Sequence, residues 1–168
     1  MITRDDLINS MLHEISVAKF IAGKIPADRW GWRPSPKQRS VLELAQYLTR
    51  AGIGSLKVHV NGNRDHAEAM IAKANSVTPL TFAKAMDDQA AEIRRVLGAL
   101  GHGRLANDRV TLPIGGPPQS LAAAILNSSL KYLTAYRMQL FMYAKQLSRE
   151  ELGTAQAWAG RDPAPAKT

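Results

Sequence analysis

The stretch DRWGWRPSPKQRSVLELAQYLTRA, Asp28–Ala51, changes from a loop to a helix at Ser40. Two tryptophans, a glycine and two prolines stand before this serine, and such a composition favours an irregular connection. Ser40 followed by Glu43 forms the capping-box pattern, in which the hydroxyl and the carboxylate each accept a hydrogen bond from an amide that the first helical turn leaves unpaired. The sequence therefore predicts a helix that begins after Ser40 and continues towards Val58. We expect the two tryptophans of the loop to pack over the end of a helical bundle.

Amphipathic segments flank this stretch on both sides. Apolar residues at helical spacing predict a helix from Thr3 to about Lys24, which ends before Pro26. A short helix is expected over residues 66–74. A further long helix is expected to start at Thr78-Pro79, with the proline at the first helical position. The last long helix is expected to run from about Gln119 to Ser148.

These segments predict an all-α protein built as a four-helix bundle. About twenty residues separate the second long helix from the third, and this length favours a topology with a long crossover connection. The connection over residues 104–118 contains a short β-like piece, Val110–Leu112, so one short β-hairpin fits there. We expect a four-helix-bundle domain over residues 1–152 and a mobile C-terminal tail over residues 153–168, in which Trp158 docks on the bundle.

The composition sets further bounds. The chain has 168 residues, of which 45% are hydrophobic and 21% charged, as is typical of a single soluble globular domain. The absence of cysteine excludes disulfides and thiolate nucleophiles, and with no apolar run long enough for a membrane we expect a cytoplasmic protein. The formal net charge is +8, but the basic residues are scattered, so nucleic-acid binding is not favoured.

The loop and helix of Asp28–Ala51 resemble the start of the DinB-like family. That family typically has a Trp-x-Pro piece, then a helix-capping serine, and a histidine seven residues after the serine. Here Trp32-Arg33-Pro34 and Ser40 supply the first two features, and Tyr47 stands at the histidine position.

The last helix carries the second part of the resemblance. In the family, two histidines four residues apart are followed by a stretch similar to Arg-Gly-Gln. In the segment KYLTAYRMQLF, Tyr132 and Tyr136 stand at the histidine positions, Arg137 and Gln139 match, and a methionine replaces the glycine.

The resemblance implies a four-helix bundle that is often a homodimer, and in many members a divalent metal held by three histidines. Some members are thiol-dependent S-transferases or metal-assisted hydrolases. Neutral imidazole is a good metal ligand at pH 7, whereas a phenol with a pKa of about 10 must first lose its proton. We therefore expect a remodelled pocket in this chain, with no metal and no other cofactor.

The candidate ligand-binding residues are Tyr47, Tyr132 and Tyr136, with Arg137 and Gln139 beside them in sequence. Tyr132 and Tyr136 share one helix face because they are one turn apart. The tyrosines are expected to be core aromatics, or to form a metal-free polar pocket in which phenols hydrogen-bond a polar or anionic ligand. Arg137 lies one position off the tyrosine face, so a salt bridge is the alternative for this residue.

The leading hypothesis is a protein that binds a small polar ligand without metal, or acts as a non-catalytic dimeric module. The alternatives are a metal-independent transferase or hydrolase and a basic helical protein that binds nucleic acid. No GxSxG or phosphate-loop motif is present, and no catalytic residue can be named. A metal site that uses His59 and His66 is a minor alternative, because no two histidines have the four-residue spacing of a helical metal site.

Overall fold

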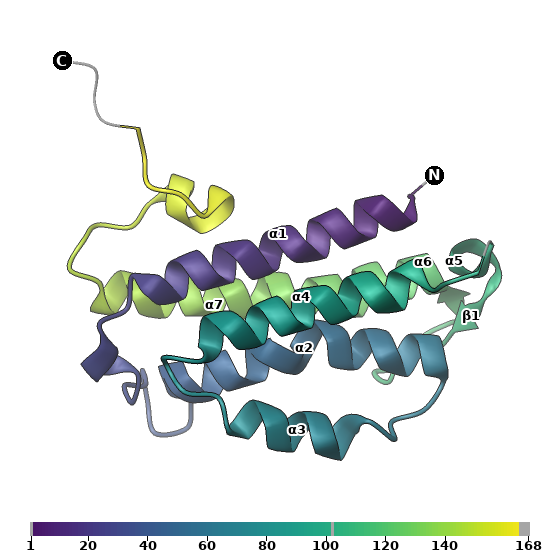
Figure 1. Ribbon diagram of the computed structural model, residues 1–168, viewed down its shortest axis with the longest axis horizontal. Helices are drawn as coiled ribbons and strands as arrows, with labels where there is room; N and C mark the ends of the chain where they lie inside the picture. Colours follow the sequence, from purple (N-terminus) through teal and green to yellow (C-terminus); the bar gives the residue numbers. More distant parts are fainter. Residues whose placement is uncertain (1, 102, 165–168) are drawn as a thin grey trace.

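Four long helices form the body of the protein in the computed structural model, which describes residues 2–101 and 103–164. They are α1 (Arg4–Gly23), α2 (Val41–Asn61), α4 (Phe82–Gly98) and α7 (Lys131–Leu147), and they lie side by side (Figure 1). Their apolar faces meet in one core, in which Met11, Leu44, Met86, Ile93 and Leu140 are fully buried. The expected all-α bundle is confirmed. Within the described residues, no helix is long and apolar enough to cross a bilayer.

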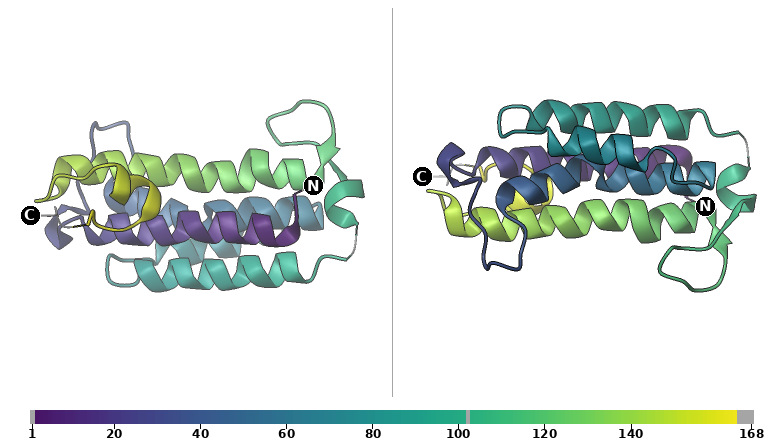
Figure 2. Two further views of the ribbon diagram at one scale, coloured as in Figure 1. Left: turned by 90° about the horizontal axis from the view of Figure 1, so that it is seen from above. Right: turned by 90° about the horizontal axis from the view of Figure 1, so that it is seen from below.

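The connection between α2 and α4 is the expected long crossover. Helix α3 (Ala67–Asn75) runs back along the outside of α2, so α2 and α4 point the same way, opposite to α1 and α7 (Figures 1 and 2). The side-chain amide of Gln46 holds the end of α3 by donating to the carbonyl oxygens of Asn75 and Val77, both at 3.0 Å. As a result, α3 covers part of α2 without joining the core of the bundle.

Two helices begin with complete capping boxes. The amide of Glu43 donates to Ser40 Oγ at 3.2 Å, and the amide of Ser40 donates to the Glu43 carboxylate at 2.6 Å, as the sequence predicted. Thr3 and Asp6 form the same arrangement at the start of α1. The predicted start of the third long helix at Pro79 is wrong, because α4 begins at Phe82. Residues 78–81 form a turn instead, in which the amide of Thr81 donates to the Thr78 carbonyl at 3.1 Å and the amide of Thr78 donates to Thr81 Oγ1 at 2.9 Å.

The connection before the last helix contains the expected hairpin. After α5 (Arg104–Asn107), strand β1 (Arg109–Val110) pairs antiparallel with β2 (Gln119–Ser120), so Leu112 lies outside the strand. The last helix is close to its predicted range, because helical structure runs without a gap through α6 (Leu121–Ala124), the π-helical turn η2 (Ile125–Leu130) and α7; the sequence did not predict the π-helical section.

The loop before α2 closes one end of the bundle, as its tryptophans predicted. It contains the short 3-10 helix η1 (Ala27–Arg29). The Trp30 side chain is buried with its ring 5.8 Å from that of Phe82, and the Trp32 ring packs edge-on against Tyr143 at 5.4 Å. These contacts fix the loop to α4 and α7.

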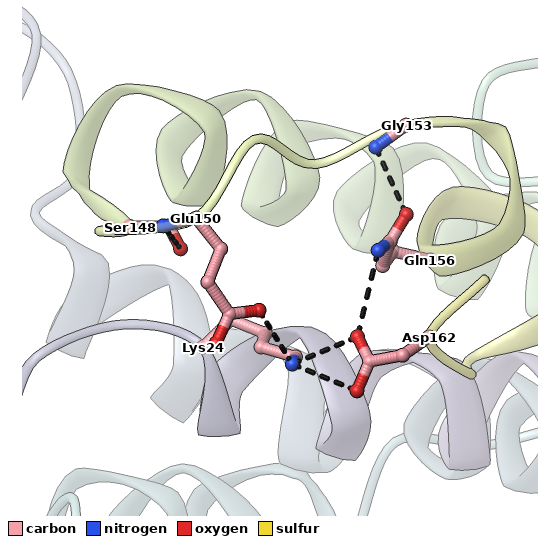
Figure 3. Close-up of polar contacts among 6 residues, drawn as sticks. All are labelled: Lys24, Ser148, Glu150, Gly153, Gln156 and Asp162. Atoms are coloured by element: carbon pink, nitrogen blue, oxygen red, sulfur yellow. Dashed lines mark hydrogen bonds and ion pairs between the residues drawn. The ribbon is translucent and has the colours of Figure 1, made fainter. Parts of the chain in front are cut away.

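The segment after α7 folds back over α1 and α7 (Figure 2, left). Figure 3 shows Lys24, the residue that follows α1, between two carboxylates of this segment, Glu150 at 2.9 Å and Asp162 at 2.8 Å. Gln156 donates to Asp162 and accepts from the amide of Gly153, and these bonds link the two sides of the π-helical turn η3 (Ala155–Ala159) within this segment.

The part of the expected tail that the structure describes is therefore packed. Gln156 and Ala157 are buried, whereas Trp158, the residue expected to dock, leaves 56% of its surface exposed. We call residues 148–164 the C-terminal strap. Residues 165–168 of the expected tail lie outside the described residues.

Candidate functional site

The three candidate tyrosines come together where α2 meets α7. Tyr47 lies in the second turn of α2, and its ring meets the edge of the Tyr136 ring at 4.6 Å. Tyr132, one turn before Tyr136 on α7, lines a pocket that Tyr47 also lines. The side-by-side packing of α2 and α7 therefore brings residues 85 or more positions apart in sequence into one place.

This pocket, which we call the tyrosine pocket, lies between α2, α3 and the start of α7 and has a volume of about 330 Å³. Much of its wall is apolar. The residues that line it are Tyr47, Arg50, Ala51, Gly54, Ser55, Val58, Arg64, His66, Ala67, Met70, Ile71, Pro113 and Tyr132. A cavity of this size and character suits a small organic molecule.

The charge of the tyrosine pocket is positive. Arg50 and Arg64 line it, and no aspartate or glutamate does. His66 adds a ring whose Nε2 lies 3.2 Å from the carbonyl oxygen of Gly54 and whose Nδ1 is buried without a hydrogen-bond partner in the described structure. Because Nε2 must donate to that carbonyl oxygen, Nδ1 of the neutral ring is an acceptor, and a ligand hydroxyl or N–H near it would satisfy this atom.

A second, more open cavity of about 400 Å³ adjoins the first and shares Tyr47 and Arg50 with it. We call it the basic cleft. Its other lining residues are Arg33, Pro36, Lys37, Gln38, Arg39, Glu43, Gln46 and Asn75. The guanidinium carbons of Arg39 and Arg50 lie 4.5 and 4.6 Å from the centre of the Tyr47 ring, so the phenol is flanked by two cations.

In the part of the chain that the structure describes, three arginines of the two cavities have no acidic partner. Among the ion pairs of the described residues, none includes Arg39, Arg50 or Arg64. Arg33 differs, because it pairs with Glu43 at 3.2 Å. The unpaired guanidiniums therefore remain available to an anion from outside the chain.

Gln139 lines neither cavity, although it was a candidate ligand-binding residue in the sequence analysis. Its side-chain amide donates to Tyr143 Oη at 2.8 Å, and Tyr143 Oη donates to the backbone carbonyl of Arg39 at 3.1 Å. Gln139 is therefore connected to the site only through the loop residue that Tyr143 holds in place.

Arg137 faces a different part of the molecule from the tyrosines. Its side chain is 1% exposed and pairs with Glu14 of α1 at 2.7 Å. It also donates to the carbonyl oxygen of Ala157 at 2.7 Å and lies 5.1 Å from the Trp158 ring. The salt bridge that the sequence left as the alternative for Arg137 is what the structure contains, and this arginine is absent from the lining of both cavities.

The protonation of Tyr47 is set by burial and by its neighbours. Burial raises the pKa of Tyr47 above its ordinary value, the neighbouring Tyr136 raises it further, and the guanidiniums of Arg50 and Arg39 oppose the shift. A phenol that holds its proton so firmly is a poor ligand for a divalent ion. Tyr47, which stands at one of the positions that the resemblance assigns to metal ligands, is therefore poorly suited to hold such an ion.

A buried polar cluster lies behind the pocket wall. Ser55 lines the pocket, and its hydroxyl donates to Ser128 Oγ at 3.0 Å, which in turn lies 2.5 Å from His59 Nε2. Ser128 also donates to the carbonyl oxygen of Ala124 at 2.6 Å, within the last helix near its π-helical turn. Burial lowers the pKa of His59, which favours the neutral ring.

Sequence reasoning missed several residues of the site. Arg39 stands in a loop, and nothing local marks it as a neighbour of Tyr47. Ser55 carries a signal that was present, because it stands four positions before His59 on the same helix face, and His59 was considered from sequence only as a metal ligand with His66. The sequence contains a weaker signal for Ser128, because the position of this residue depends on an irregular helical turn.

Comparisons with known proteins bear on the fold. A scan against protein-family models found no match, and a search of curated proteins found none. The chain superposes on the crystal structure of a DinB-like protein from Bacillus subtilis with a TM-score of 0.67 and 16% sequence identity, over 88% of this chain and 96% of that one. The chain therefore has the fold of a DinB-like protein, which confirms the architecture implied by the sequence resemblance.

Proposed function

Starting from this shared fold, we propose that the protein binds a small organic anion in the tyrosine pocket and does so without a metal ion. The observation that carries the proposal is the lining of that pocket: tyrosines, arginines and a histidine, with no carboxylate. A fixed excess of positive charge against an apolar wall favours a ligand that has both an anionic group and an apolar body.

The individual donors support the same reading. Arg50 and Arg64 supply charged donors, and the Tyr132 hydroxyl can donate or accept one hydrogen bond. His66 Nδ1 is a buried atom that lacks a partner in the described structure, and a hydroxyl or N–H of the ligand would donate to it. The apolar wall, which includes Val58 and Met70, accommodates the hydrocarbon part of the ligand.

A second candidate function is metal-independent hydrolysis or group transfer. It is favoured by Ser55, because this residue lines the pocket and its hydroxyl connects through Ser128 to His59. Binding without catalysis ranks first, because Ser55 Oγ lies 3.4 Å from His59 Nε2 and the imidazole has no carboxylate among its hydrogen-bond partners in the described structure.

The test is calorimetric titration with two probes of the same shape, naphthoate and its neutral amide. We expect naphthoate to bind and the amide to bind at least about tenfold more weakly, since the amide lacks the charge that the arginines attract. Chelation of metals with EDTA should leave the affinity for naphthoate unchanged.

Two variants locate the binding. Arg64→Ala should weaken naphthoate by about tenfold, whereas Arg94→Ala, which removes the same charge from an exposed position on α4 outside both cavities, should change it by less than about twofold. Equal affinity for acid and amide, or loss of binding with EDTA, would refute the proposal. Hydrolysis of naphthyl acetate that Ser55→Ala abolishes would favour the second candidate.

A further inference from the structure

We infer that the ligand carries a phosphate group, which lies in the basic cleft while the apolar body occupies the tyrosine pocket. This inference rests on the proposed function and specifies its ligand class: an organic phosphomonoester. It starts from the fact that the two cavities meet at Tyr47 and Arg50, which line both.

The charge of the cleft exceeds what one carboxylate would offset. Glu43 is paired with Arg33, so Lys37, Arg39 and Arg50 remain without an acidic partner among the described residues. Arg39 and Arg50 lie within about 9 Å of each other, the sum of their distances to the Tyr47 ring centre. Like charges so close repel each other, and a phosphate with a charge of about −2 relieves this repulsion better than a carboxylate.

The cleft is also held in shape before a ligand arrives. The backbone of Arg39 is fixed because its carbonyl oxygen accepts from Tyr143 Oη, and the Tyr143 ring packs against Trp32. The Arg39 side chain is positioned over the Tyr47 and Tyr136 rings, at 4.5 and 5.7 Å. Guanidiniums held in this way lose little freedom when they form paired hydrogen bonds with phosphate oxygens.

The two cavities differ in character in the way such a ligand requires. The basic cleft is lined mostly by charged and amide side chains, whereas the tyrosine pocket has apolar walls. A phosphate in a nucleic-acid backbone would use the cleft alone, because a pocket of about 330 Å³ takes one small body and not a strand. A free phosphomonoester uses both cavities.

The experiment compares naphthyl phosphate, naphthoate, inorganic phosphate and a single-stranded oligonucleotide by calorimetry on the intact protein. Naphthyl phosphate should bind at least about tenfold more tightly than either naphthoate or inorganic phosphate, because only this probe fills both cavities. The oligonucleotide should not compete with it at physiological salt.

Three variants assign the phosphate to the cleft. Arg39→Ala should weaken naphthyl phosphate by about tenfold and leave naphthoate within about twofold. Tyr143→Phe keeps the ring against Trp32 but releases the Arg39 carbonyl, so it should weaken naphthyl phosphate by a few-fold and leave naphthoate unchanged. Arg94→Ala is the charge-matched control and should change neither affinity.

The contrary results separate the two proposals. If naphthoate and naphthyl phosphate bind equally and neither responds to Arg39→Ala, the phosphate inference is overturned while the proposed function stands. Inorganic phosphate that binds as tightly as naphthyl phosphate would overturn the inference too, because the apolar body then contributes nothing. An oligonucleotide that displaces naphthyl phosphate with a steep salt dependence would assign the cleft to nucleic acid. Failure of every probe to bind overturns both.

Discussion

At the scale of single residues, Tyr47 contacts more of the candidate site than the other two tyrosines do. Its ring contacts Tyr136, lies beside two guanidiniums and forms part of the wall between two cavities. Burial and Tyr136 keep its proton bound, while the arginines favour its loss. The balance is a raised pKa, and a neutral phenol can donate a hydrogen bond to an anion at neutral pH.

The ionisation of Tyr47 gives a direct prediction. Because its pKa is higher in the folded chain than the ordinary value of 10.0, the unfolded chain loses this proton first as the pH rises. The free energy of unfolding should therefore fall as the pH rises from about 10 through the raised value. Absorbance titration of the phenols should show a step above the ordinary range that disappears in Tyr47→Phe. Tyr132→Phe, the control, should keep that step. Loss of the step in this control would contradict the assignment of the raised pKa to Tyr47.

At the scale of elements, local sequence predicted what local contacts decide. Both capping boxes bridge three residues, so Thr3 and Ser40 marked the starts of α1 and α2. The π-helical turn in the last helix could not be predicted, because no proline or glycine marks it and Ser128 contacts Ser55 and His59 of another helix. The same distinction applies to the site. Helical spacing was enough to predict that the tyrosines share a helix face, whereas the position of Arg39 depends on a partner 104 residues away.

The packing of α2 on α7 makes a prediction at Gly52. A Cβ at this position would lie 2.7 Å from Leu133 Cδ1 and 2.9 Å from Leu133 Cγ, closer than atoms pack. Gly52→Ala should therefore lower the free energy of unfolding by about 1–3 kcal/mol in urea denaturation. Gly54→Ala on the same helix is the matched control, since its Cβ would meet only Met70 Cε at 3.6 Å. That change should stabilise α2 by about 0.5–1 kcal/mol. Equal effects of the two changes would contradict this account of the contact.

The pairing of α2 with α4 predicts a pH dependence. Hydrogen bonds from Arg95 and then Lys57 lower the pKa of Glu92 from 4.5 to about 2. The stabilisation is complete above pH 4.5 and is lost as the pH falls through about 2. Glu92→Gln should reduce stability at pH 7 by about 1 kcal/mol, and should flatten the decline of stability below pH 4.5. Glu68→Gln removes an exposed carboxylate outside the ion pairs of the described residues. In this variant the free energy of unfolding should depend on acid pH as it does in the parent.

At the scale of the whole molecule, the C-terminal strap joins the two ends of the chain. Arg137 of α7 is buried between Glu14 of α1 and the Ala157 carbonyl of the strap, so one guanidinium connects three parts of the fold. Lys24, with its two carboxylates, adds a more exposed connection (Figure 3). The site lies elsewhere in the bundle, so the strap can be tested apart from ligand binding.

Removal of Glu14 tests this arrangement. Glu14→Ala leaves a buried guanidinium without its counter-charge and should lower the free energy of unfolding by about 3–5 kcal/mol. Glu14→Ala combined with Arg137→Met should be less destabilised than Glu14→Ala alone, because the unpaired charge is gone. Asp87→Ala, which breaks an exposed pair with Lys19, should change stability by less than about 1 kcal/mol. A double variant with a lower free energy of unfolding than Glu14→Ala alone would contradict this account.

Helix α3 has a consequence for how this protein can diverge. It packs chiefly on α2 and lies outside the core, yet its residues help to line the tyrosine pocket on one side and a further cavity towards α4 on the other. Mutations at exposed α3 positions such as Ile71 therefore reshape the pocket mouth while the bundle keeps its folding stability. Selection for a new ligand can act first on this short helix, so related chains should differ most in α3 and retain the helices beneath it.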